Sequence, residues 1–191
     1  MKYLIISLAI IMANIFHATS QGVSIGDRIP SFKATADDGS SWNLSDHLGK
    51  DYLVVYFFPG AMTSGCTKQA CAYRDNKQNL VSEGIDVVGI SSDNPENLKL
   101  FKKAENLNFT LLSDDKGDIA KLFGVPTGQG GSIIRTVDGK EYQLTRDFSE
   151  KRWTFIVDKD GKIVYKNDAV DPEKDSEQVL NFIKEHKQAG S

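Results

Sequence analysis

The feature that most constrains the fold is an unbroken apolar run, Tyr-Leu-Val-Val-Tyr-Phe-Phe, at residues 52–58. Seven residues without polar alternation predict a strand that is buried on both faces, because a half-exposed strand alternates polar and apolar side chains. Strands of this kind lie in the middle of α/β sheets. The run therefore predicts a layered α/β fold with this strand at its centre.

Strand and helix patterns alternate along the rest of the chain. Further strands are expected at residues 85–91, 109–112, 153–157 and 162–165, and helices at 64–82, 95–105, 118–123 and 172–186. A short N-terminal hairpin is expected at residues 32–44, turning at Asp37-Asp38-Gly39, and a second hairpin within residues 132–147, turning at Asp138-Gly139. The glycine-rich residues 127–131 are expected to form a flexible bend. This order predicts a mixed sheet with helices on both faces.

The first 20 residues have the pattern of an export signal. Lys2 precedes an apolar run at residues 3–16, and Ala18-Thr19-Ser20 supplies a small-x-small ending. The apolar run is shorter than the roughly 20 residues that a membrane-spanning helix needs, so cleavage is favoured over a retained anchor. We expect a periplasmic or secreted protein in which residues 21–191 form a single domain, a normal size for one hydrophobic core.

Both cysteines, Cys66 and Cys71, follow the apolar run closely. Pro59-Gly60 ends the predicted strand, and a helix that opens at Thr63 or Ser64 would hold Cys66 in its first turn. Unpaired backbone N–H groups and the helix dipole favour an anion at that position. A thiol there is biased towards the nucleophilic thiolate.

The spacing of the two cysteines argues against a permanent disulfide. Residues five apart on a helix are separated by about 7.5 Å along the axis and by about 140° around it. Their Cα atoms then exceed the limit of roughly 7 Å for a disulfide, so a bond between Cys66 and Cys71 requires the helix to unwind. A bond that forms and breaks during a reaction fits this spacing better than a structural one.

The motif Pro59-x-x-x-Thr63-x-x-Cys66 resembles the active-site signature of the peroxiredoxins, which are thiol peroxidases with a thioredoxin-like fold. The longer run at residues 56–75 is similar to the Q-type subfamily, also called bacterioferritin comigratory proteins. The resemblance extends over essentially the whole chain after the leader. It implies a thioredoxin-like α/β fold in which a mixed central sheet is flanked by helices. Residues 127–152 are longer than the usual link in the family, so an extra hairpin is expected before the Arg152 strand.

The resemblance also implies a role for five residues. Cys66 matches the peroxidatic cysteine, which attacks the peroxide and becomes a sulfenic acid, and Cys71 matches the resolving cysteine, which condenses with it to an intramolecular disulfide. Thr63 matches the residue whose hydroxyl links thiolate and peroxide, and Pro59 matches the proline that shields the site from water. Arg152 matches the arginine that stabilises the thiolate and polarises the peroxide. No cofactor or metal is required.

The same resemblance implies partners for the reaction. The substrates would be hydrogen peroxide and organic hydroperoxides, and a thioredoxin-like or other dithiol protein would supply electrons. The export signal leaves the identity of that donor open, because many relatives are cytoplasmic or organellar. The resemblance favours a monomer. Cleavage of the leader would leave no membrane contact. A formal net charge of −3 argues against a nucleic-acid partner.

Other classes of protein remain as alternatives. An exported copper-binding or metallochaperone protein would use two cysteines and a histidine, but His47 and His186 do not lie next to the cysteines in the sequence. A disulfide oxidoreductase normally has two residues between its cysteines, and here there are four. A purely structural disulfide is the third alternative. For single residues, Cys66 could be an inert core thiol, Thr63 only a helix cap, and Arg152 a surface charge.

Overall fold

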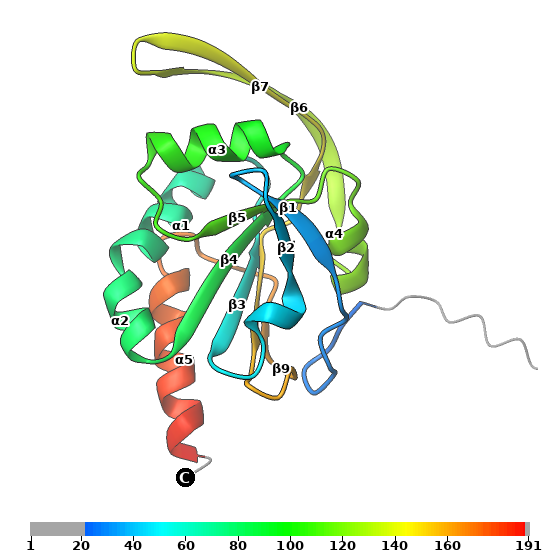
Figure 1. The fold of residues 1–191 in the computed structure, drawn as a ribbon, viewed down its shortest axis with the longest axis vertical. Coiled ribbons are helices and arrows are strands. Elements are labelled where there is room, and N and C mark those ends of the chain that lie inside the picture. Colours follow the sequence, from blue (N-terminus) through cyan, green and yellow to red (C-terminus); the bar gives the residue numbers. More distant parts are fainter. Residues whose placement is uncertain (1–21, 190–191) are drawn as a thin grey trace, which may run out of the picture.

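A seven-stranded mixed sheet forms the centre of the computed structural model, which describes residues 22–189 (Figure 1). The strand order is β2-β1-β5-β4-β3-β8-β9, and β6 and β7 form a separate two-stranded sheet. The expected leader at residues 1–20 lies outside the described residues. Among residues 22–189, no helix combines the length and the apolar character that crossing a membrane requires.

The strands are β1 Lys33–Ala36, β2 Ser41–Asn43, β3 Tyr52–Phe57, β4 Ile85–Ser91, β5 Thr110–Ser113, β6 Thr127–Val137, β7 Lys140–Glu150, β8 Trp153–Val157 and β9 Ile163–Asn167. The helices are η1 Leu44–His47, α1 Ser64–Asp75, α2 Lys77–Ser82, α3 Pro95–Ala104, α4 Asp118–Phe123 and α5 Asp175–Ala189. The mixed sheet, the flanking helices and the N-terminal hairpin of β1 and β2 confirm the fold predicted from the sequence.

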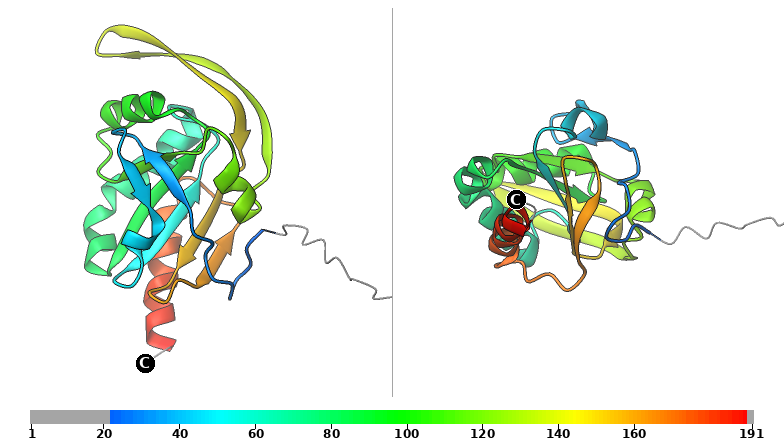
Figure 2. Two further views of the ribbon diagram at one scale, coloured as in Figure 1. Left: turned by 45° about the vertical axis from the view of Figure 1, so that its right-hand side comes forward. Right: turned by 90° about the horizontal axis from the view of Figure 1, so that it is seen from below.

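Strand β3 is buried along its whole length, as its apolar run predicts. Its side chains alternate between two hydrophobic cores, because successive residues of a strand point to opposite faces. Val54 and Tyr56 join the core that includes residues of α1, α2, α3 and α5, whereas Leu53 and Phe57 join the core that includes α4 and the N-terminal segment. The two views in Figure 2 show helices on both sides of the sheet.

The register of β3 fixes which residues meet at its C-terminal end. The strand runs parallel to β4 and antiparallel to β8, so that Phe57 lies opposite Trp153. The loop that follows β3 therefore starts beside the residues that precede β8. This pairing brings Pro59 and Arg152, which are far apart in the sequence, to the same edge of the sheet.

The extra hairpin before Arg152 is present, and it is longer than the sequence predicted. Strands β6 and β7 pair from Thr127 opposite Glu150 to Val137 opposite Lys140, and this ribbon extends over α3 (Figures 1 and 2). The expectation of a flexible bend at residues 127–131 was wrong, because these residues belong to β6. At Gly130 a Cβ atom would lie 2.2 Å from the Arg146 carbonyl oxygen, so glycine there allows the backbones to approach closely.

Two helix boundaries also differ from the prediction. The single helix expected at residues 64–82 is interrupted at Asn76, whose φ and ψ of −91° and 3° separate α1 from α2. The Asn76 side chain accepts a hydrogen bond from Asn79 Nδ2 at 2.7 Å, and asparagine favours such local bonds over helix continuation. Helix α5 begins at Asp175, because the Asp171 carboxylate accepts a bond from Glu173 N at 3.0 Å and holds a turn there.

Candidate active site

Cys66 is the third residue of α1 and lies in its first turn, as expected from the sequence. Its side chain is 1% exposed. The Nη2 atom of Arg152 lies 3.3 Å from Cys66 Sγ and donates a hydrogen bond to it. A positive guanidinium and the N-terminal end of a helix thus meet at one buried sulfur, and both favour negative charge there.

A chain of hydrogen bonds holds Arg152 in this position. Its Nη1 donates to Gln69 Oε1, and Gln69 Nε2 donates to Asp175 Oδ2 at 2.7 Å. The same Asp175 oxygen accepts bonds from Tyr73 Oη at 2.7 Å and Thr154 Oγ1 at 2.8 Å. Burial raises the pKa of Asp175, although these three donors oppose the shift. The first residue of α5 thereby orients the arginine through a glutamine.

Sequence reasoning assigned no role to Gln69 or Asp175. Gln69 lies one helical turn after Cys66 and is fully buried. The sequence shows this spacing, but it does not show that Gln69 bonds to Arg152 and Asp175. Asp175 is more than 100 residues away from Gln69. Acidic residues are common in the first turn of a helix, and most of them are exposed. Nothing in the neighbouring sequence shows that Asp175 is one of the buried ones.

Thr63 lies at the N-cap position of α1, but its hydroxyl does not cap the helix. Among the described residues, the hydroxyl donates instead to the carbonyl oxygen of Gly60, at 2.9 Å. The alternative that Thr63 serves only as a helix cap therefore has no side-chain capping bond behind it. The lone pairs of the Thr63 hydroxyl oxygen stay available to accept a bond. Pro59, at the start of the loop, is partly buried.

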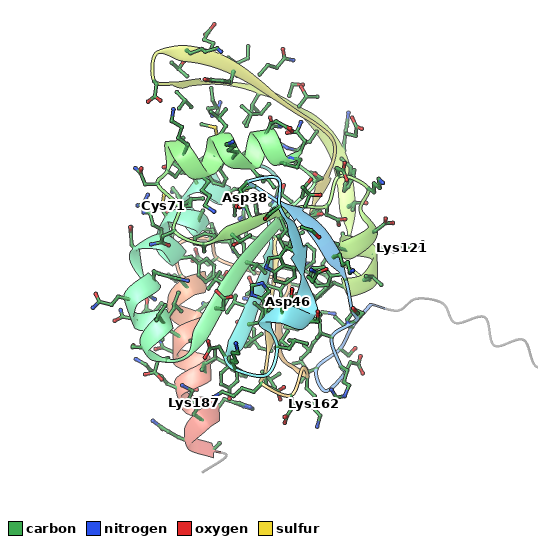
Figure 3. All side chains as sticks on the ribbon, viewed as in Figure 1. Asp38, Asp46, Cys71, Lys121, Lys162 and Lys187 are labelled. Atoms are coloured by element: carbon green, nitrogen blue, oxygen red, sulfur yellow. The ribbon has the colours of Figure 1, made fainter. Side chains whose placement is uncertain are left out.

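Cys71 lies on the same helix as Cys66 but in different surroundings. It is half-buried, and its thiol donates to Glu105 Oε2 at 3.6 Å. Burial raises the pKa of Cys71 above the usual value of 9.0, the Glu105 carboxylate adds to the rise, and Arg74 opposes it. Figure 3 shows Cys71 near the periphery of the molecule. Both thiols are free, and the continuous helix α1 keeps them apart.

The structure thus brings Cys66 and Arg152 together, places Pro59 and Thr63 on the adjoining loop, and leaves Cys71 outside this contact. Cys66 and Arg152 are in contact, and the loop containing Pro59 and Thr63 leads directly into the helix of Cys66. Arg74 Nε donates to Asp75 Oδ1 at 2.8 Å, and Arg74 Nη1 donates to the Glu105 carbonyl oxygen.

The two histidines considered as metal ligands have other neighbours. His47 Nδ1 lies 3.2 Å from Asp86 Oδ2, and its ring stacks on Trp42. His186 stacks on Phe182. Within residues 22–189, no group of three or more His, Cys, Asp or Glu side chains is arranged to hold a metal ion.

A cysteine in the first turn of the helix after a buried parallel strand, with an arginine at its sulfur, defines a thiol-dependent enzyme with a thioredoxin-like fold. The chain belongs to the AhpC/TSA family, whose model matches residues 25–166. It is a peroxiredoxin of the Q type and hence a thiol peroxidase, as its relatives show.

Two curated relatives and one solved structure illustrate this relationship. The chain is 43% identical over 161 residues to peroxiredoxin Bcp of Escherichia coli, which covers 84% of this chain and 96% of the relative. It is 38% identical over 163 residues to the chloroplastic peroxiredoxin Q of Populus jackii, covering 84% and 68%. The crystal structure of peroxidoxin BcpB from Mycobacterium tuberculosis superposes with a TM-score of 0.70 at 30% identity, covering 84% of this chain and 96% of that chain.

Proposed function

We propose that Cys66 is the peroxidatic residue of this peroxidase. The observation that carries the proposal is the 3.3 Å hydrogen bond from Arg152 Nη2 to Cys66 Sγ in the first turn of α1. The Cys66 thiolate attacks one peroxide oxygen, the O–O bond breaks, and the sulfur is oxidised to a sulfenic acid. The other oxygen takes a proton and leaves as water or an alcohol, so hydrogen peroxide and organic hydroperoxides are both substrates.

The neighbouring residues assist this displacement in different ways. Arg152 stabilises the thiolate and donates to the peroxide oxygens as they gain negative charge. The Thr63 hydroxyl donates to Gly60, which leaves its oxygen free to accept the O–H of the peroxide and to aim the reacting oxygen at the sulfur. Pro59 shields the site from water, as the resemblance to the family implies.

Cys71 resolves the sulfenic acid in a second step. Its thiolate attacks the oxidised sulfur, an S–S bond forms, and the sulfenic oxygen leaves as water. The step requires α1 to unwind, because both cysteines lie within one continuous helix. It also breaks the contact between Cys71 and Glu105. A thioredoxin-like or other dithiol protein then reduces the disulfide and completes the cycle.

We extend the proposal to the cellular setting. The pattern of residues 1–20 supports export and cleavage, after which residues 21–191 act as a single domain in the periplasm or outside the cell. The resemblance to the Q-type subfamily supports a monomer. N-terminal sequencing of the protein isolated from the exported fraction tests the leader, and a chain that keeps residues 1–20 would contradict cleavage.

Stopped-flow measurement of peroxide reduction by two variants tests the chemistry. Cys66→Ser should abolish peroxide consumption. Cys71→Ser should consume one equivalent of peroxide and then stop at the sulfenic acid, which mass spectrometry detects after trapping with dimedone. Sustained turnover of Cys71→Ser at the native rate would contradict the role of Cys71. A disulfide that resists mild reductant and never passes through a sulfenic acid would favour a structural bond.

A further inference from the structure

The β6–β7 ribbon presents one face to the rest of the molecule. Every second residue is shielded from Ile133 to Val137 on β6 and from Tyr142 to Glu150 on β7, whereas the residues between them are mostly exposed. Two arginines lie on this inner face, Arg135 on β6 and Arg146 on β7. Both donate hydrogen bonds to backbone carbonyls of the loop between β3 and α1.

Arg146 reaches this loop through a buried carboxylate. Its Nε lies 3.2 Å and its Nη2 3.0 Å from Asp93 Oδ1, and the two side chains are 7% and 0% exposed. Asp93 Oδ2 accepts a bond from the backbone N–H of Ala61 at 2.7 Å, and Arg146 Nη2 donates to the Ala61 carbonyl at 3.3 Å. The ion pair thus holds both the N–H and the carbonyl of Ala61.

The guanidinium of Arg146 also packs directly on Gly60. A Cβ atom at Gly60 would lie 2.4 Å from Arg146 Cζ and 2.5 Å from its Nη1, so the position admits only a glycine while the arginine is in place. The carbonyl of the same Gly60 accepts the hydroxyl of Thr63 at 2.9 Å. The orientation of the Thr63 hydroxyl therefore depends on a peptide that Arg146 and Asp93 hold in place.

Arg135 makes a second contact with the same loop. Its Nε donates to the carbonyl of Met62 at 2.9 Å. Met62 has a φ of 60°, a left-handed conformation that residues other than glycine rarely adopt and that persists where the surroundings hold it. Both strands of the ribbon consequently fix the residues that lie immediately before Thr63.

We propose that Arg146 is a positioning residue for the peroxidase reaction: together with Asp93 it holds the Gly60–Ala61 backbone so that the Thr63 hydroxyl is aimed at the peroxide bound beside Cys66. The inference rests on the proposed function, because it uses the role of Thr63. The ribbon thereby completes the active site from outside the central sheet. A lysine cannot replace this arginine, because only the planar guanidinium binds a carboxylate with two nitrogens and lies flat on a glycine.

Two variants of the otherwise unchanged protein test the proposal, Arg146→Lys and Gly60→Ala. Each is compared with the parent in the rate constant of Cys66 oxidation by hydrogen peroxide and in the rate constant of Cys66 alkylation by iodoacetamide, followed by mass spectrometry. Alkylation needs a reactive, accessible thiolate but no aligned peroxide. We expect peroxide oxidation to slow by roughly tenfold or more, since small misplacements near a reacting group have effects of that size, while alkylation stays within about threefold.

Val137→Ala is the matched control, because it removes packing from the inner face at the far end of the ribbon. It should lower the melting temperature and leave the peroxide rate unchanged. Peroxide rates within twofold of the parent in Arg146→Lys and Gly60→Ala would overturn the inference, as would equal losses of peroxide oxidation and alkylation. If Arg146→Lys does not fold, Gly60→Ala decides alone, since it disturbs the same contact from the loop side. A parent whose Cys66 does not react with peroxide would instead refute the proposed function.

Discussion

The contact between Cys71 and Glu105 should limit how fast the disulfide forms. The Cys71 thiol donates to Glu105 Oε2 at 3.6 Å, and this bond exists only while α1 is helical. Glu105→Ala removes the acceptor and the negative charge together. The substitution removes the Cys71–Glu105 contact from the native helix and leaves the unwound state unchanged. The free-energy difference between the two states becomes smaller, so the unwound, reactive state is more populated.

The size of the effect follows from the value of one hydrogen bond. A net contribution of about 1 kcal/mol corresponds to roughly a fivefold change in an equilibrium constant, and hence in the rate of a step that passes through the unwound helix. Glu105 is only partly buried, so its charge adds little beyond this value. We therefore expect disulfide formation in Glu105→Ala to be about fivefold faster than in the parent at pH 7.

The pH dependence of the same step follows from the raised pKa of Cys71. The native helix favours the protonated Cys71 thiol. This preference stabilises the helix fully at a pH below the ordinary pKa of a cysteine, and the stabilisation is lost as the pH rises through the raised pKa of Cys71 in the native helix. Because the attacking species is the thiolate, disulfide formation should accelerate about tenfold per pH unit from pH 7 to about 9. In Glu105→Ala the pKa of Cys71 falls back towards its ordinary value, and the plateau should begin at a lower pH.

Rapid mixing with one equivalent of peroxide, quenching with N-ethylmaleimide and mass spectrometry of the disulfide measure this rate. Glu96→Ala is the matched control, because it removes an exposed glutamate from the other end of α3. Its disulfide should form at the parental rate. A rate in Glu105→Ala equal to or below that of the parent, together with no acceleration between pH 7 and 9, would refute the reasoning.

Three further predictions concern the site and the core. Arg152→Gln should slow Cys66 oxidation by roughly 10- to 100-fold, since a hydrogen bond to a charged group contributes about 1.5–3 kcal/mol; a loss below threefold in stopped flow would contradict this. Glu150 is buried, and its burial together with the neighbouring Asp114 carboxylate raises its pKa well above 4.5. The native state then loses stability as the pH rises through that pKa, so Glu150→Gln should raise the urea midpoint at pH 7 and not at pH 4. Leu53→Ala, in the fully buried β3, should lower the free energy of unfolding by about 2–5 kcal/mol, and a loss below 1 kcal/mol would show that this position is not part of a packed core.

The parts of the fold that were predictable from the sequence depend on local chemistry. The apolar run of β3 carries its signal within a few residues. The start of α3 does so too, in Asn94-Pro95, where Asn94 Oδ1 accepts a bond from Asn97 N at 2.8 Å. The interruption at Asn76 was missed because one asparagine lowers helix propensity only slightly. The extension of β6 through its glycines was missed because strand pairing with β7 overrides their weak propensity.

The active site likewise contains residues that could be predicted from the sequence and residues that could not. The place of Cys66 in the first helical turn follows from the Pro-Gly sequence and the helix start, and Arg152 was found through the family motif. The pairs that hold these residues in position join distant parts of the chain: Gln69 and Asp175 are 106 residues apart, and Asp93 and Arg146 are 53 apart. A single sequence does not show which buried carboxylate pairs with which arginine, because these pairs form only through tertiary packing.

The separation of the β6–β7 ribbon from the central sheet gives it a freedom that no other strand pair in residues 22–189 has. Because β6 and β7 bond to each other and to no third strand there, residues can be added at or removed from the turn at residues 138–139 without shifting the register of the seven-stranded sheet. Changes of two residues per strand also preserve the alternation that keeps Arg135 and Arg146 on the inner face. The length of the ribbon can therefore change at this turn, in evolution or in design, while Arg135 and Arg146 keep their contacts with the loop before Thr63.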